Sequence, residues 1–159
     1  MNALHRIERF LDSNLIPFEV VSHPHTQTSA ETARRAGIAA GRVAKGVLLD
    51  STGCLMVAMV PADQDIRLGK LGQDNATDYS LADAASIAEL FEGCEPGVIP
   101  GLPNLWGVEM IWDDALMAQP DLYLEAGDHE RLVHVETRHL RKVFSDAPHC
   151  HFSKPRTRH

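Results

Sequence analysis

Lys45 is the residue whose type and position most suggest chemistry. It stands in "RVAKGVLLD", residues 42–50, a run that otherwise predicts a buried β-strand. In a strand its side chain shares a face with apolar neighbours, so its ammonium must reach water over the strand edge, pair, or face a cavity. Gly46 beside it is consistent with a cavity, because a strand glycine often marks close approach by another backbone or a ligand.

The loop "EPGVIPGLP", residues 95–103, is the second candidate. Gly97 and Gly101 would let backbone N–H groups approach an ester or phosphate oxygen, and Pro100 and Pro103 would keep the loop stiff. No Gly-Lys-Ser/Thr follows and no clear helix begins, so the loop is neither a P-loop nor a dinucleotide fingerprint. The pattern alone indicates a backbone-lined binding loop.

The remaining histidines and cysteines match no known metal or nucleophile motif. His129 stands in the predicted turn "GDHE", where a histidine is most often a surface residue. The other candidate metal ligands are two histidine pairs spaced by two, His23 with His25 and His149 with His151, and three widely spaced cysteines, Cys54, Cys94 and Cys150. Without HExxH, CxxC or G-x-S-x-G we expect no metal site, disulfide framework or serine nucleophile.

The bulk composition predicts one soluble globular domain. The chain has 159 residues, 44% hydrophobic and 23% charged, and a formal net charge of −7, which argues against non-specific attraction to nucleic acid. Charges in the first 14 residues exclude a signal peptide, and no apolar run approaches the roughly 18 residues that span a bilayer. We therefore expect a cytosolic protein.

The elements that must position these residues alternate between helices and hairpin-like strands. Thr28 is the expected N-cap of one helix, Gly37 its left-handed end, and Thr137 the N-cap of the last helix. The pattern predicts a first helix that carries Leu4, Ile7, Phe10 and Leu11 on one face and ends at "SNLIP", residues 13–17. It further predicts helices over 29–37, 82–91 and 137–144, a helical turn over 114–119, a short helix and loop within 63–79, and strands over 18–21, 42–50, 54–61, 108–113, 122–126 and 132–136. This mixed α/β class favours a mixed sheet or partly closed barrel with packed helices over a doubly wound parallel sheet.

With Lys45, the glycine-proline loop and the "AGDH" turn in this order, the chain resembles the YbaK family. These aminoacyl-tRNA editing domains occur free-standing or inserted in bacterial prolyl-tRNA synthetases. The resemblance runs from "IPFEVVSHPHTQTSAETARRAGI" to "LYLEAGDHERLVHV", nearly the whole chain. It depends on the order, spacing and type of all the motifs together.

The resemblance implies a curved, mostly antiparallel sheet and hydrolysis of the ester that joins a wrongly attached amino acid to the 3′ end of tRNA. We expect a single editing domain over residues 1–148, and the basic composition of the C-terminus predicts a flexible tail over 149–159. The expected partners are the acceptor end of a mischarged tRNA and a synthetase that delivers it, with no membrane or DNA. No cofactor or metal is implied.

The resemblance also assigns the site. Lys45 would hold the terminal adenosine end of the substrate, and the loop from Gly97 would position the aminoacyl group by backbone contacts. The expected catalytic residues are thus Lys45 and Gly97, and the expected substrate-binding residues are Val98, Ile99, Pro100, Gly101, Gly127, Asp128 and His129. The family often has Thr or Ser in place of Gly46 and an apolar residue in place of Gly101, which leaves the identity of the substrate open.

A mechanism for such a site needs no strong nucleophile. An aminoacyl ester is already activated and the neighbouring ribose hydroxyl can assist, so positioning and fixed dipoles carry much of the acceleration. Lys45 would act as a cationic anchor rather than a general base, and a small cavity would admit side chains the size of alanine or cysteine. The alternative is a non-catalytic module that binds a nucleotide or aminoacyl-adenosine in the same cleft.

Overall fold

The computed structural model describes residues 2–156. The helices are α1 (Ala3–Ser13), α2 (Ser29–Ala36), α3 (Leu68–Asp74), α4 (Ala84–Leu90), α5 (Asp114–Met117) and α6 (Thr137–Val143), with short 3-10 turns η1 (Ala40–Arg42) and η2 (Pro103–Trp106). The strands are β1 (Phe18–Ser22), β2 (Val43–Ser51), β3 (Cys54–Pro61), β4 (Gln64–Ile66), β5 (Ser80–Leu81), β6 (Glu109–Asp113), β7 (Asp121–Glu125), β8 (Arg131–Glu136), β9 (His149–Cys150) and β10 (Ser153–Pro155). Within 2–156, no helix has the length and apolar character needed to cross a membrane.

Two of the three predicted helix caps are observed. The Thr28 hydroxyl accepts a hydrogen bond from Glu31 N at 3.1 Å, and α2 ends at Gly37 with φ +71°, as predicted. The predicted N-cap of α6 was wrong by one residue, since Glu136 occupies that position. Glu136 still pairs with Asp121 as the last residue of β8, so the helix begins directly at Thr137.

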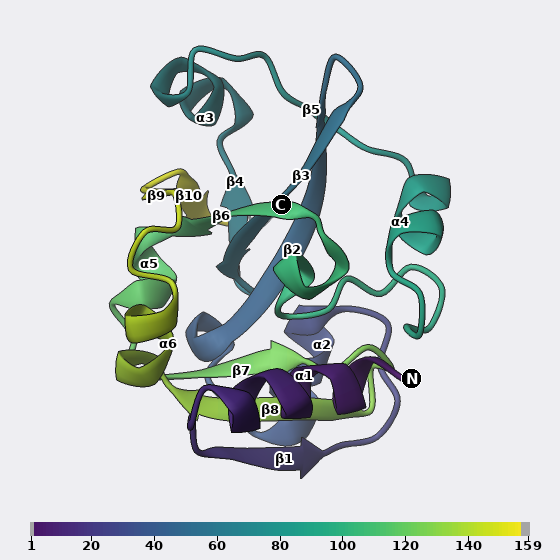
Figure 1. The fold of residues 1–159 in the computed structure, drawn as a ribbon. Coiled ribbons are helices and arrows are strands. Elements are labelled where there is room, and N and C mark those ends of the chain that lie inside the picture. Colours follow the sequence, from purple (N-terminus) through teal and green to yellow (C-terminus); the bar gives the residue numbers. More distant parts are fainter. Residues whose placement is uncertain (1, 157–159) are drawn as a thin grey trace.

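Eight strands form one sheet in the order β1-β8-β7-β2-β3-β6-β9, with β5 added beside β2. The pairs β1–β8, β7–β8, β2–β3 and β2–β5 are antiparallel, whereas β2–β7, β3–β6 and β6–β9 are parallel. The long β2–β3 hairpin rises through the molecule above the β7, β8 and β1 layer (Figure 1). The predicted mixed α/β fold with a mostly antiparallel sheet is confirmed.

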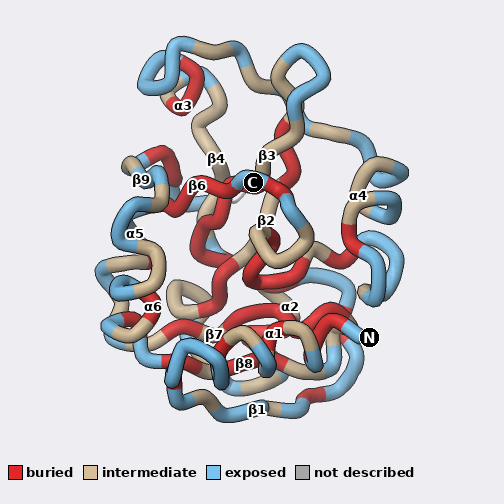
Figure 2. Tube along the Cα trace, viewed as in Figure 1, coloured by how far each residue is buried: buried red, intermediate tan, exposed pale blue. Residues whose placement is uncertain are grey.

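Both faces of β2 are covered, which places this strand at the centre of the core. The main core packs α1 and α6 against the sheet, and a second core lies under α3 and the C-terminal strands. Buried members are Ile7, Leu11, Ala44, Leu48, Leu122, Leu124, Val133 and Leu140 in the main core, and Leu49, Val60, Leu71 and Phe152 in the second. Buried segments run through the middle of the chain trace, whereas the tip of the β2–β3 hairpin is exposed (Figure 2).

The C-terminal segment is held against the sheet. The sequence predicts a flexible tail over residues 149–159, but β9 pairs with β6 and β10 pairs with β4. The buried Asp113 carboxylate accepts hydrogen bonds from the backbone N–H groups of Phe152 at 2.9 Å and Ser153 at 2.7 Å. Residues 149–156 are therefore ordered by pairing and burial, and 157–159 lie outside the described residues.

Candidate functional site

The site lies where two adjacent parallel strands part. The paired register between β2 and β7 ends at Ala44 and Leu124, and the next residues are Lys45 and Glu125. From there β7 continues in register with β8, whereas β2 continues with β3 and, at Leu49 and Asp50, with β5. The loop after α4 enters this opening, and Gly101 N–H donates to the Glu125 carbonyl at 2.9 Å. The parting of the strands therefore creates a cleft that the loop partly fills.

A pocket of about 390 Å³ occupies the cleft. That volume is in the range of small-ligand sites. Its walls come from the start of α2, from β2, from β5 and α4, from the loop after α4, from the β7–β8 turn and from the C-terminal segment. The lining residues are Gln27, Thr28, Ser29, Lys45, Gly46, Val47, Leu48, Leu81, Ala82, Ile87, Gly97, Ile99, Glu125, His129 and Arg156.

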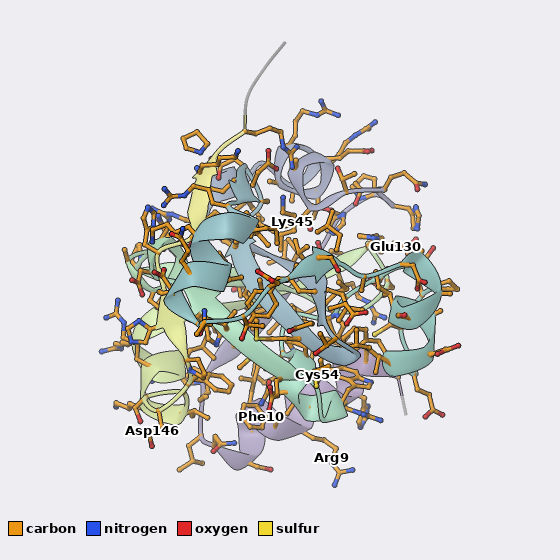
Figure 3. The ribbon with its side chains drawn as sticks, turned by 90° about the horizontal axis from the view of Figure 1, so that it is seen from above. Arg9, Phe10, Lys45, Cys54, Glu130 and Asp146 are labelled. Atoms are coloured by element: carbon orange, nitrogen blue, oxygen red, sulfur yellow. The ribbon has the colours of Figure 1, made fainter. Side chains whose placement is uncertain are left out.

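Lys45 lies toward the middle of the molecule, whereas Arg9 and Asp146 lie at its periphery (Figure 3). Its Nζ donates a hydrogen bond to the Gln64 carbonyl at 2.9 Å, and the residue lines the pocket. Burial lowers the pKa of Lys45 below the ordinary 10.5, and the positive charge of Arg156 lowers it further. Lys45 is thus anchored by one backbone acceptor at the wall of a cavity, and does not simply reach water over the strand edge.

Gly46 and Gly101 are the two places where the loop packs directly on the sheet. A Cβ on Gly46 would lie 2.6 Å from Ile99 Cγ2, and a Cβ on Gly101 would lie 2.5 Å from Leu124 Cβ. Distances below 3.0 Å leave no room for a side chain at either position. The close approach anticipated for Gly46 is therefore made by the loop after α4, through the side chain of Ile99.

The structure brings four of the predicted site residues to the pocket. Lys45, Gly97, Ile99 and His129 line it, and Gly97 has φ +85°, a conformation that favours glycine. The others support the wall: Val98, Pro100 and Gly101 are buried in the loop, and Gly127 and Asp128 lie in the β7–β8 turn, outside the lining set.

His129 is fixed in its turn by contacts on both sides. Its φ is +55°, which is uncommon for a residue with a side chain. Asp128 Oδ1 accepts from Glu130 N at 2.9 Å and Arg131 N at 3.0 Å, closing the turn. Thr26 N–H donates to the His129 carbonyl at 3.2 Å, so the segment before α2 holds the same residue. This strained backbone is over-determined, as is common at functional sites.

Glu125 is the main site residue that the sequence did not reveal. Its side chain is almost fully buried, with the residue 2% exposed. Oε1 accepts a hydrogen bond from the Ser29 hydroxyl at 3.2 Å, and Oε2 lies 3.8 Å from His129 Nδ1. Burial raises the pKa of Glu125 from 4.5 to about 7. In "LYLEA" it alternates with apolar residues and shares a face with half-buried Tyr123, so the pattern gave no sign of burial.

Three of the four histidines considered as metal ligands, His25, His149 and His151, lie beside carboxylates, whereas Nδ1 of His23 lies 2.7 Å from the Pro24 carbonyl oxygen. His25 Nε2 lies 3.0 Å from Glu95 Oε1, and His149 Nδ1 lies 2.7 Å from Asp114 Oδ1. Over residues 2–156, no group of three or more potential metal ligands is found. His25 and His149 therefore link segments that are distant in the sequence by pairing with carboxylates.

The family model of the aminoacyl-tRNA editing domain matches residues 23–143. The chain belongs to this family. The matched range of the editing domain includes every lining residue of the pocket except Arg156, which the C-terminal segment supplies. None of the curated proteins is detectably similar in sequence.

Solved structures share the fold of this editing domain. The crystal structure of the hypothetical protein APE2540 has a TM-score of 0.81 and 18% identity, covering 94% of this chain and 99% of its own. A protein named as a candidate trans-editing enzyme for prolyl tRNA synthetase has a TM-score of 0.79 and 18% identity, covering 97% of this chain and 98% of its own. At such identities the likeness establishes the fold of the editing domain.

Proposed function

We propose that this editing domain hydrolyses the ester bond between a small, wrongly attached amino acid and the 3′ end of a tRNA. The observation that carries the proposal is the composition of the pocket. Two cations, Lys45 and Arg156, and a buried carboxylate beside His129 line one cavity with an apolar wall. The substrate end combines phosphate and ribose oxygens, an ammonium group and a small side chain, which these groups complement in charge and polarity.

Lys45 is the anchor for the terminal adenosine end in this proposal. Its Nζ already donates to Gln64 O, and Asp63 and Asp65 raise its pKa against the lowering by burial and by Arg156. The cationic form gives a charge-assisted hydrogen bond to a phosphate or ribose oxygen. Arg156 lies beside the same acidic residues and adds a second positive charge at the pocket.

The loop after α4 positions the ester through its backbone. Val98 N–H donates to Glu95 O at 3.0 Å and Gly101 N–H to Glu125 O at 2.9 Å, so these two groups are used inside the protein. Among residues 2–156, the N–H groups of Gly97 and Ile99 have no backbone acceptor, and both residues line the pocket. They are the donors that we assign to the ester carbonyl, where negative charge develops during attack by water.

Selectivity for a small amino acid follows from the apolar wall. Val47, Leu48, Ile87 and Ile99 line the pocket with bulky side chains, and the loop is packed tightly onto Gly46. We infer that the pocket accepts a side chain the size of alanine or cysteine beside them and that a larger one would require the loop to move. In this proposal the chain acts as a second sieve, which hydrolyses tRNA carrying a small amino acid that a synthetase has failed to exclude.

The net charge of −7 indicates weak contact with the body of tRNA. Delivery of the charged acceptor end by a synthetase is therefore part of the proposal. The structural neighbour named as a candidate trans-editing enzyme for prolyl tRNA synthetase supports this partner class.

The test is a deacylation panel with alanyl, cysteinyl, seryl and prolyl esters on matched and mismatched tRNAs. We expect rapid release of one small amino acid and little release of bulkier ones. Absence of turnover on every ester would contradict the proposal. Retained binding of a non-hydrolysable aminoacyl-adenosine analogue by the inactive protein would then identify a binding module.

A further inference from the structure

Two buried polar atoms without hydrogen-bond partners face each other at the pocket. Glu125 Oε2 and His129 Nδ1 are both buried, and neither has a hydrogen-bond partner among the described residues. They are 3.8 Å apart, beyond hydrogen-bond distance but within reach of a small side-chain rotation. Buried polar groups are rarely left unpaired, so a pair at this separation is expected to close.

The other end of the carboxylate is already held. Glu125 Oε1 accepts from the Ser29 hydroxyl at 3.2 Å, at the start of α2. On the same residue, the carbonyl oxygen accepts from Gly101 N–H at 2.9 Å. The carboxylate therefore has a fixed position from which only Oε2 is free, and Oε2 is the oxygen next to His129.

The backbone of His129 is equally fixed, by the Asp128 turn and by Thr26. The two ring nitrogens of an imidazole lie on different sides of the ring, so the partner of Nδ1 decides which nitrogen is left for a ligand. When Glu125 is ionised, as at pH 8, above its pKa of about 7, its carboxylate can only accept, so closing the pair then requires a proton on Nδ1. Nε2 then carries the lone pair.

We propose that Glu125 is a positioning residue for His129, whose Nδ1–H donates to Glu125 Oε2 and whose Nε2 accepts a hydrogen bond from the substrate. This inference rests on the proposed function for the identity of the ligand. The donor on the substrate side is a hydroxyl or ammonium group, both of which an aminoacyl-adenosine end carries. Ser29 completes the chain by holding the far oxygen of the carboxylate.

The tautomer of His129 tests the pair without any assay of activity. Imidazole ¹⁵N shifts are measured for the whole protein at pH 8, and the His129 signals are assigned by their loss in His129→Ala. We expect the Nδ1–H tautomer in the wild type and in Glu125→Gln, whose amide oxygen also accepts, and the Nε2–H tautomer in Glu125→Ala. The same tautomer in wild type and Glu125→Ala would overturn the proposal.

Kinetics then test whether Glu125 acts through His129. We expect Glu125→Ala and His129→Ala each to lower kcat for deacylation at least tenfold, and the double variant to be within twofold of His129→Ala. Glu125→Gln should retain kcat within about threefold, and so should Glu130→Gln, a control at an exposed glutamate in the same turn. If the loss of kcat in the double variant equalled the product of the losses in the two single variants, the proposal would be overturned.

The two proposals fail in different ways. If the wild type hydrolyses no ester, the proposed function fails, while the tautomer measurement still decides whether Glu125 orients His129. If the wild type is active and the tautomer of His129 is the same in wild type and Glu125→Ala, only the positioning role fails. Thermal unfolding of Glu125→Ala serves as the check that the variant is folded.

Discussion

Lys45 and Glu125 are the first residues beyond the last register pair of two adjacent parallel strands, and both line the same pocket. This relationship locates the cleft, because β2 and β7 stop pairing with each other directly before the two charged residues. A cation and a buried carboxylate are thereby placed on neighbouring strands with the loop after α4 between them. The site is a consequence of where one parallel ladder ends.

Replacing Lys45 by Ala is expected to lower kcat/KM for deacylation at least tenfold. The variant loses a charge-assisted hydrogen bond worth about 1.5 to 3 kcal/mol, and the ordinary conversion gives about tenfold for each 1.4 kcal/mol. Lys142→Ala, which removes an exposed lysine from α6, is the matched control and should leave the rate unchanged. Equal rates for Lys45→Ala and wild type on every ester of the panel would contradict the anchoring role.

Replacing Gly46 by Ala should displace the loop from the sheet. The new Cβ would lie 2.6 Å from Ile99 Cγ2 and 3.1 Å from Val57 Cγ1. Such overpacking costs about 1 to 3 kcal/mol of unfolding free energy, and we expect a several-fold loss of kcat/KM because Ile99 lines the pocket. Urea denaturation and single-turnover deacylation measure the two effects.

Two further variants show whether Ile99 is the obstacle. Adding Ile99→Ala to Gly46→Ala removes the closest atom and should recover part of the lost stability. Gly69→Ala is the control, since a Cβ there meets nothing within 4 Å in the exposed part of α3, and it should be neutral or slightly stabilising. A double variant less stable than Gly46→Ala would show that the strain lies elsewhere.

Glu125 should make stability fall as the pH rises. Its pKa is raised by burial from 4.5 to about 7, so the folded state holds this proton more tightly than the unfolded state. The contribution is fully present below about pH 4.5 and is lost as the pH rises through about 7, by roughly 3 kcal/mol at 1.36 kcal/mol per pKa unit. The difference in unfolding free energy between wild type and Glu125→Gln, measured from pH 5 to 8, isolates this residue.

We expect the unfolding free energy of the wild type to decrease relative to that of Glu125→Gln as the pH rises. Glu130→Gln, at an exposed glutamate of the same turn, is the matched control in this series. A flat or opposite trend for Glu125→Gln would mean that the carboxylate is not protonated in the folded protein near neutral pH.

The hydrogen bonds from Phe152 and Ser153 to the Asp113 carboxylate should affect both the stability of the fold and the position of Arg156. Asp113→Ala removes the acceptor for the N–H groups of Phe152 and Ser153, and hydrogen bonds to buried charged groups are worth about 1.5 to 3 kcal/mol each. We expect a loss of about 3 to 6 kcal/mol in unfolding free energy, the sum for the two bonds, and a raised KM for the aminoacyl ester. Chemical denaturation and steady-state kinetics measure these effects.

Arg156→Ala separates the effect of the C-terminal segment on KM from its effect on stability. Its ion pair with Asp65, at 3.5 Å, is about half exposed and contributes little to stability. We expect a raised KM with unfolding free energy within about 0.5 kcal/mol of wild type. An unchanged KM would show that the C-terminal segment stabilises the fold without contributing to the pocket.

The sequence by itself determined the local features of this protein. Capping at Thr28 and Gly37, the β2–β3 hairpin and the oddity of Lys45 follow from short-range patterns of residue type, and these predictions agree with the structure. The predicted N-cap at Thr137 was wrong because the preceding residue is still paired in β8. Local patterns identify an element well and its exact end less well.

Only the tertiary structure decided how the site is composed. The parallel register of β2 and β7 joins distant segments, and neither Glu125 nor Arg156 carries a local signal of lining a pocket. The requirement for glycine at positions 46 and 101 arises only because the loop after α4 packs closely on the sheet there. The alternation of residues along a strand predicts only which side chains point to the core and which to solvent. Glu125 is buried instead by segments distant in the sequence, which pack around the point where β2 and β7 stop pairing.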